Sequence, residues 1–196
     1  MQRRYVSLSG LSAVRHGDVL LFRGGGPLSR VIRGAGRGEY SHAGMAAYWH
    51  LDLFLLEVRW IGARVTLLER EVRRRPADTI DVYRVTQPGM IQPDCIGWWD
   101  GAKDAVRVMR RLAGEHYGWR SLARTAVRHL PLIRCILPPL VDDAMTNGHA
   151  PYCSQAVAYA LRAAGVDPVP NLADQATEPS DLARSAHLAY QFTLRP

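Results

Sequence analysis

A cysteine near the C-terminal end of the chain has the surroundings of a nucleophile. Cys153 follows Pro151 and Tyr152, and the apolar residues after it recur at helical spacing until Gly165 provides a stop. Because proline is favoured in the first turn of a helix, the pattern predicts a helix over 152–164 with Pro151 at its start. A thiol at a helix N-terminus feels the positive end of the helix dipole, which favours the thiolate and lowers the pKa. The pattern therefore predicts an activated cysteine.

A histidine and a glutamate could serve this cysteine as base and orienting group. His42 begins one apolar run and Glu57 ends the next, and a tight turn is expected between them, near residues 50–52. If the two runs form neighbouring antiparallel strands, the carboxylate and the imidazole lie side by side. A carboxylate in that position fixes the imidazole tautomer and stabilises the imidazolium, which is the third role in triad chemistry. The sequence thus offers a Cys-His-Glu constellation.

The elements that must position these residues are mostly strands in the first half of the chain and helices in the second. Strands are predicted at 18–23, 42–49, 53–60, 63–68, 79–85 and, at an edge of the sheet, 188–194. Helices are predicted at 27–33, 97–113, 119–129 and 152–164. Strands and helices that separate along the chain in this way indicate the α+β class.

Composition sets the outer bounds of the prediction. The 196 residues fit one domain, 1–196. There is no run of about eighteen apolar residues that would span a membrane, and we expect no signal peptide, so a cytoplasmic or phage-associated location is predicted. The three cysteines, Cys95, Cys135 and Cys153, show neither metal nor disulfide spacing. They predict a reducing compartment or a free reactive thiol, with no metal site.

The net charge of +7 is carried almost entirely by arginine. One cluster lies at 70–75 and a second at 107–111. Each could be a solvated face, or it could attract anionic surfaces such as cell-wall polymers, phospholipid or nucleic acid. The aromatic interleaving of single-strand nucleic-acid binders is absent, so no specific nucleic-acid partner is expected. Nothing in the pattern fixes an oligomeric state.

The order of the motifs resembles one known family. Papain-like enzymes usually run Cys, then His, then a polar third residue, whereas here the order is His, Glu, Cys. That order is similar to the permuted branch of the NlpC/P60 superfamily, to which the YiiX-like proteins belong. The segments that resemble the family's opening strand, His strand, Glu strand, nucleophile elbow and closing segment are Gly17–Phe22, Tyr40–Met45, Leu56–Val58, Tyr152–Gln155 and Pro179–Leu182. The match spans most of 14–186 and is weak between 88 and 147.

The resemblance implies a circularly permuted papain-like fold, in which an antiparallel sheet packs against the nucleophile-bearing helix. Residues at about 97–147 would be a helical and apolar insertion. It also implies a cysteine peptidase or amidase, or an acyl-esterase, which works through a thioester without a cofactor. Cys153 would attack, His42 would move the proton, and Glu57 would orient His42. The substrate would be a cell-wall peptide or a lipid-linked acyl group.

Further site residues follow from the same resemblance. Tyr117 looks like a tyrosine that lines the family's site, and Tyr152 and Ser41, the neighbours of the nucleophile and the base, are assigned to substrate binding with it. The apolar, proline-broken segment 130–141 could be core, a lid over the cleft, or a lipid-facing loop.

Alternatives remain open for each main role. Glu69 or Asp52 could orient the histidine in place of Glu57, and His149 is a rival base. His42 is preferred because the permuted fold needs its base on the sheet opposite the helix. The cysteine could be an ordinary buried hydrophobe, and the histidine and glutamate could be structural strand-end residues. The alternative function is a non-catalytic structural or binding module, such as a phage virion component that retains the fold.

Overall fold

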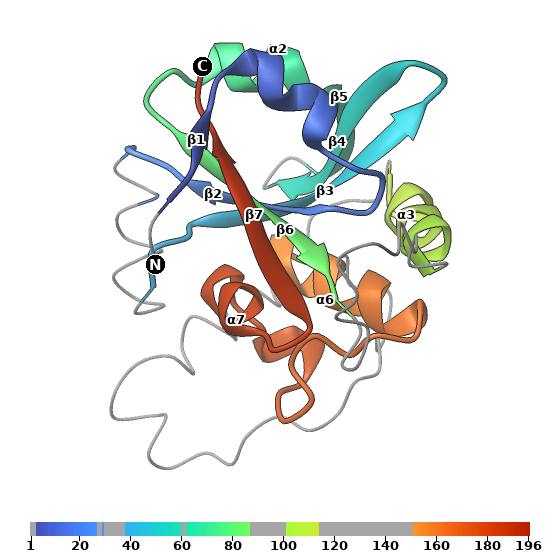
Figure 1. Cartoon of the computed structure of the whole chain (residues 1–196). Helices are drawn as coiled ribbons and strands as arrows, with labels where there is room; N and C mark the ends of the chain where they lie inside the picture. Colours follow the sequence, from blue (N-terminus) through green and yellow to red (C-terminus); the bar gives the residue numbers. More distant parts are fainter. Residues whose placement is uncertain (1–2, 27–28, 30–37, 60–61, 87–100, 114–150) are drawn as a thin grey trace.

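A single mixed sheet organises the chain. The computed structural model describes residues 3–26, 29, 38–59, 62–86, 101–113 and 151–196 (Figure 1). Among these residues, seven strands pair in the order β1-β7-β6-β2-β3-β4-β5. Their bounds are β1 (Tyr5–Val6), β2 (Val19–Arg23), β3 (His42–Trp49), β4 (Asp52–Arg59), β5 (Gly62–Leu67), β6 (Thr79–Val85) and β7 (Leu188–Leu194).

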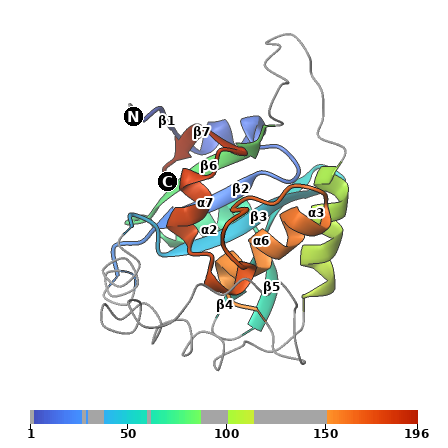
Figure 2. The same ribbon diagram turned by 90° about the horizontal axis from the view of Figure 1, so that it is seen from below.

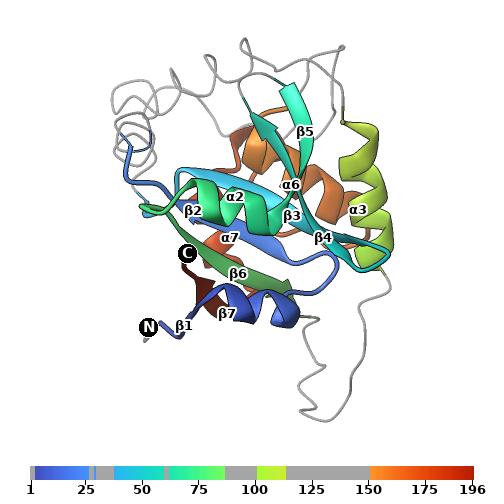
Figure 3. The same cartoon turned by 90° about the horizontal axis from the view of Figure 1, so that it is seen from above.

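Short helices cover both faces of this sheet. The helices of the described residues are η1 (Leu8–Ala13), α2 (Leu68–Arg74), α3 (Gly101–Arg111), α6 (Cys153–Ala163), η2 (Asp174–Ala176) and α7 (Pro179–Arg184). Helices α3, α6 and α7 lie on one face, which Figure 2 shows from below. Helices η1 and α2 lie on the other face, seen from above in Figure 3. The protein is therefore of the α+β class, as predicted.

Each face of the sheet has its own apolar core, because side chains alternate along a strand. The core under α3 and α6 takes Met45 from β3 and Leu56 from β4. The core under α2 and η1 takes the intervening residues, among them Ala46 and Leu55. The buried residues of α3 and of the turn that follows it, Ala102, Ala105, Val106, Met109 and Leu112, agree with the amphipathic pattern of the sequence.

The C-terminal strand departs from the prediction. Residues 188–194 do form a strand, β7, but it lies inside the sheet and not at its edge. The edge is β1, whose two residues pair in parallel with β7, Tyr5 with Thr193 and Val6 with Leu194. All the other strand pairs are antiparallel. A two-residue strand carries too little alternation to be read from sequence, so both the edge position and the purely antiparallel sheet were wrong expectations.

The hairpin that carries the candidate base forms where it was expected. Trp49 of β3 pairs with Asp52 of β4, so the turn consists of His50 and Leu51. His50 has a φ of 53°, as a two-residue hairpin turn requires. The strand predicted at 63–68 ends at Leu67 instead, and α2 follows at once. Most of the helix expected at 27–33, all of the helix expected at 119–129 and most of the insertion at 97–147 lie outside the described residues.

Candidate active site

The β3–β4 hairpin sets His42 beside Glu57. Gly44 lies directly opposite Glu57 in the antiparallel register, and His42 is two residues before Gly44. His42 and Glu57 are therefore diagonal neighbours on one face of the sheet. The bond between His42 Nε2 and Glu57 Oε2 is 2.7 Å long. The other ring nitrogen, Nδ1, is left for a partner on the opposite side of the ring.

Gly44 allows this close approach of the two strands. A Cβ atom at this position would lie 2.6 Å from Leu55 Cδ1 and 2.9 Å from the Leu56 carbonyl oxygen. Both contacts are too short, and the second is with backbone that cannot move without shifting β4. The glycine therefore keeps β4, and with it Glu57, within reach of the imidazole.

The α6 helix places Cys153 at its first position. Tyr152 is the N-cap, so the expectation that Pro151 occupies the first turn was wrong: Pro151 precedes the cap. The Gln155 side chain bends back, and its Oε1 accepts a hydrogen bond from the Tyr152 N–H at 3.4 Å. The helix ends as predicted near Gly165, which has a φ of 88°. The N–H groups of the first helical turn have no carbonyl acceptor within α6, and they point to the N-terminal side of the helix.

Two hydroxyl groups anchor the start of α6. Tyr152 donates to the Gln175 carbonyl at 2.7 Å and to the Thr177 carbonyl at 3.2 Å. Ser154 Oγ donates to the same Thr177 carbonyl at 2.8 Å. The residues on both sides of Cys153 are thus fixed to the chain segment that leads into α7, which limits the positions that the thiol can take.

The cysteine and the histidine meet where β3 and β4 part. Strand pairing between β3 and β4 stops at Gly44 and Glu57, so Ala43 lies beyond the paired region. Its N–H group, that of Ser154 and the imidazole of His42 all lie close enough to the sulfur of Cys153 to influence the pKa of the thiol. Burial alone would raise the pKa of the thiol, but the charge and hydrogen bond of His42 and the two N–H groups lower it below its ordinary value.

The imidazole is held in its charged form. Burial disfavours the imidazolium, but the thiolate of Cys153 and then the carboxylate of Glu57 outweigh this effect and raise the pKa of His42 to about 9. Glu57 is fully charged for the complementary reason. Its burial opposes the charge, yet His42, Arg59 and Arg64 lower its pKa to about 2. The site therefore favours a thiolate–imidazolium pair with a carboxylate behind it.

Two arginines hold the second oxygen of the glutamate, and sequence reasoning missed both. Arg64 lies opposite Glu57 on β5, and its Nε donates to Glu57 Oε1 at 2.7 Å. Arg59 Nε is 3.2 Å from the same oxygen. A signal was present in the sequence: Arg59 is two residues beyond Glu57, and the β4–β5 turn brings Arg64 across from it. If β3, β4 and β5 are interpreted from the sequence as two consecutive hairpins, Arg59 and Arg64 are both expected on the same face of the sheet as Glu57.

The other predicted site residues have different surroundings. Ser41 is buried, and its hydroxyl is bonded to the backbone of the β2 end, accepting from the Gly24 N–H and donating to the Phe22 carbonyl. Tyr152 is buried in the anchoring contacts described above. These contacts give both residues a structural role, and their predicted part in substrate binding stays a prediction. Tyr117, the segment 130–141 and the rival base His149 lie outside the described residues.

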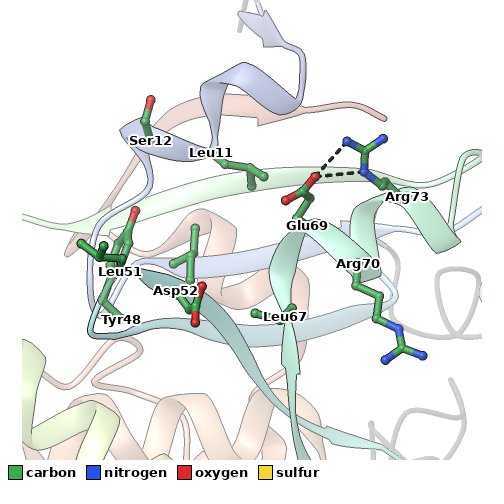
Figure 4. A pocket seen from close by; sticks show the side chains of 10 residues that line it. Leu11, Ser12, Tyr48, Leu51, Asp52, Leu67, Glu69, Arg70 and Arg73 are labelled. Carbon is green, nitrogen blue, oxygen red and sulfur yellow. Dashed lines mark hydrogen bonds and ion pairs between the residues drawn. The ribbon is translucent and has the colours of Figure 1, made fainter.

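The rival orienting groups lie away from the imidazole. Glu69 is exposed on α2 and bonded to Arg73, and Asp52 is exposed at the β3–β4 turn. Both belong to the lining of a cavity of about 610 Å³ between η1, the β3–β4 turn and α2 (Figure 4). Its lining includes none of the three candidate catalytic residues. It lies at the end of β3 distant from His42.

The arginine clusters are partly used within the protein. In the first cluster, Arg73 pairs with Glu69, and Arg75 pairs with Glu71. The remaining two arginines of this cluster are exposed. In the second cluster, the Arg110 guanidinium lies over the ring of Trp49, 5.0 Å from the ring centroid.

The described part of the chain lacks two further features, a metal-binding cluster and a membrane-spanning helix. No group of three or more His, Cys, Asp or Glu side chains within it could hold a metal ion. No helix within it combines the length and the apolar character needed to cross a membrane.

The fold and the three converging side chains define an α+β protein with a cysteine, histidine and glutamate at the meeting point of a helix and a splayed hairpin. No protein-family model matches the sequence, and no curated protein matches it significantly. A solved structure does match: the metalloprotein YiiX from Escherichia coli O157:H7, DUF1105. The similarity has a TM-score of 0.62 at 14% sequence identity, and covers 93% of this chain and 99% of YiiX. At this identity the similarity establishes the fold.

Proposed function

We propose that the protein is a cysteine hydrolase that transfers an acyl group through a Cys153–His42–Glu57 triad. The observation that carries the proposal is the meeting of the three side chains, and the directions of their pKa shifts fit the charge state that such chemistry needs. The thiol lies at a helix N-terminus against the imidazole, and the imidazole is bonded to a buried carboxylate at 2.7 Å. An ordinary structural cysteine has no need of this charge arrangement.

Acylation would begin with the ion pair. The Cys153 thiolate attacks the substrate carbonyl carbon, and the carbonyl π electrons move to the oxygen. N–H groups of the first turn of α6 would stabilise this oxyanion. When the oxyanion collapses, the bond to the leaving amine or alcohol breaks, and His42 donates its proton to the leaving group. The product of this half-reaction is a thioester on Cys153 with a neutral imidazole.

Deacylation would reverse the roles. Neutral His42 takes a proton from water, and the hydroxide so formed attacks the thioester carbonyl. Collapse of the second oxyanion expels the Cys153 thiolate and releases the carboxylic acid. The imidazolium–thiolate pair is restored, so no proton is gained or lost by the enzyme. Through both steps Glu57 stabilises the imidazolium and keeps Nδ1 directed at the sulfur.

We place the protein in the permuted, YiiX-like branch of the NlpC/P60 superfamily. The order His42, Glu57, Cys153 along the chain and the similarity of fold to YiiX support this placement. The whole chain, 1–196, would then be one permuted papain-like domain. The related structure is that of a metalloprotein. Among the described residues of this chain, no group of three or more His, Cys, Asp or Glu side chains could hold a metal ion.

The substrate class follows from the same placement. We propose an amide or ester carbonyl, in a cell-wall peptide or a lipid-linked acyl group. The net charge of +7 would favour an anionic polymer or surface around that carbonyl.

The test is an activity comparison on two substrate panels. Peptidoglycan fragments and acyl esters are incubated with the wild type, with Cys153→Ala and with the double variant Cys95→Ala/Cys135→Ala as a matched cysteine control. We expect release of an amine or alcohol by the wild type and by the control, and none by Cys153→Ala. A product formed at equal rates by all three proteins would refute the triad. A wild type whose Cys153 resists a thiol probe at mildly acidic pH would favour the non-catalytic module.

A further inference from the structure

A second buried carboxylate lies behind the candidate triad. Glu71 is on α2, which packs against β4 and β5 (Figure 3), and only 2% of its surface is exposed. Three arginines surround it. Its Oε1 is 3.3 Å from Arg64 Nη2 and 3.7 Å from Arg59 Nη1, and it also pairs with Arg75.

Glu71 shares two of these arginines with Glu57. Arg59 bridges the two carboxylates, with Nε 3.2 Å from Glu57 Oε1 and Nη1 3.7 Å from Glu71 Oε1. Arg64 also bridges them: its Nε and Nη2 are each 2.7 Å from Glu57 Oε1, and Nη2 is 3.3 Å from Glu71 Oε1 as well. The planar guanidinium has donors in a fixed fork, so a partner on one branch fixes the direction of the other. Glu57 Oε1 is thereby occupied, and Oε2 is left for His42.

We propose that Glu71 is a positioning residue of this site, which holds Glu57 in register with His42 through the shared guanidinium groups of Arg59 and Arg64. The proposal rests on the function proposed above, since it gives Glu71 a role only if His42 and Cys153 form a reactive pair. The proposal adds Glu71 to the site as a residue that contacts neither the substrate nor the imidazole.

Charge balance gives the physical reason. Arg59, Arg64 and Arg75 carry three positive charges behind the carboxylates. The negative charge of Glu71 offsets much of this positive charge, so the negative charge of Glu57 can stabilise the imidazolium. Without the charge of Glu71, these arginines would be offset by the charge of Glu57 alone. They would also repel the imidazolium. Loss of Glu71 should therefore weaken the thiolate–imidazolium pair.

A second contact connects the same cluster to the site. The Arg75 guanidinium lies over the ring of Phe22, 5.4 Å from its centroid. The Phe22 ring in turn contacts His42, with the ring centroids 5.3 Å apart. Glu71 is thus linked to two neighbours of the imidazole: to Glu57 through Arg59 and Arg64, and to Phe22 through Arg75.

The neighbouring Glu69 provides a matched control. It is on the same helix and pairs with Arg73, but both side chains are exposed, 57% and 62%. An exposed pair of this kind contributes little to stability and has no path to the site. A comparison of Glu71→Gln with Glu69→Gln therefore separates loss of an acidic residue on α2 from loss of the buried network.

The experiment measures the rate of Cys153 alkylation by iodoacetamide against pH, with peptide mapping to resolve the cysteines. We expect the apparent pKa of the Cys153 thiol to rise by about one unit in Glu71→Gln. Alkylation at pH 6 should then fall about tenfold, while the plateau rate at high pH stays the same. Glu71→Asp, which keeps the charge, should recover most of the rate, and Glu69→Gln should match the wild type. Circular dichroism on each variant confirms that the fold is kept.

The outcomes separate the two proposals. A wild-type Cys153 with an ordinary thiol pKa would refute the reactive pair, and with it the proposed function. A wild type with a lowered pKa that Glu71→Gln leaves unchanged would overturn the role of Glu71 alone. If Glu71→Gln does not fold, Arg64→Lys replaces it, because the lysine ammonium lacks the rigid planar fork that sets the directions of the two carboxylates. That variant should also raise the thiol pKa, and an unchanged pKa would refute the positioning role.

Discussion

Replacing Glu57 by glutamine tests the central electrostatic claim. Glutamine keeps the size and one oxygen but removes the charge that faces His42. The pKa of His42, about 9 against an ordinary 6.5, corresponds to about 3 kcal/mol in favour of the imidazolium. Burial opposes this stabilisation, and the thiolate of Cys153 supplies part of it. A carboxylate at hydrogen-bond distance commonly shifts a neighbour by about 1 to 3 units. We therefore expect Glu57→Gln to lower the pKa of His42 by about 1 to 2 units.

The assay isolates the carboxylate from the thiol. In a Cys153→Ser background, the imidazole resonances of His42 are followed by NMR from pH 5 to pH 10, with Glu57 and then with Gln at position 57. The difference between the two titrations is the contribution of Glu57, since the thiolate is absent from both. In the protein with Cys153 intact, the same substitution should lower turnover by about 10- to 10⁴-fold. The basic limb of the pH–rate profile should move to lower pH, because the imidazolium is lost earlier.

Two results would refute the reasoning. If the two titrations coincide, the bond between His42 and Glu57 has no electrostatic consequence. If Glu57→Gln keeps full turnover while His42→Ala has none, the histidine is catalytic but its orienting group has been misassigned.

Three further predictions concern the thiol, the acid stability and the hairpin. At pH 6 to 7 Cys153 should alkylate much faster than the other two cysteines, as read by peptide mapping, and equal rates would remove the nucleophile assignment. The pKa of Glu57, about 2 against an ordinary 4.5, contributes stability that is present above pH 4.5 and is lost as the pH falls toward 2. In Glu57→Gln the decrease in unfolding free energy between pH 5 and pH 2.5 should therefore be smaller by about 2 kcal/mol in urea titrations; a decrease as large as that of the wild type would contradict the assignment. Gly44→Ala should cost about 1 to 3 kcal/mol, measured by the same titrations, and lower turnover at least tenfold, because the added Cβ pushes β4 away; unchanged stability would show that the strands have room to spare.

The sequence contained enough to predict the hairpin and its two site residues. The spacing of His42 and Glu57 with a tight turn between them fixes both on one face of the sheet, because side chains alternate along each strand. The helix that carries Cys153 was predicted within a residue at each end, since apolar periodicity and Gly165 mark it locally. These features depend on short-range chemistry, which a single sequence displays.

What could not be predicted depends on how the elements pack against one another. The α2 helix is only seven residues long, and its apolar residues, Leu68 and Val72, are too few to define a period. The burial of Glu71 results from the arginines that three separate segments bring to it. The parallel pairing of β1 with β7 joins the two ends of the chain, and neither strand's pattern indicates its partner. In each case tertiary packing decides what local propensity leaves open.

The two halves of the site are about a hundred residues apart along the chain, and this separation orders the events of synthesis. The β3–β4 hairpin is a local unit and can form as soon as it leaves the ribosome. The start of α6 can reach its position only when the segment that bonds Tyr152 and Ser154 has also emerged. Contacts of such long sequence separation form late in folding. A nascent chain would therefore carry an ordinary, weakly reactive thiol, and the reactive thiolate would arise as one of the last products of folding.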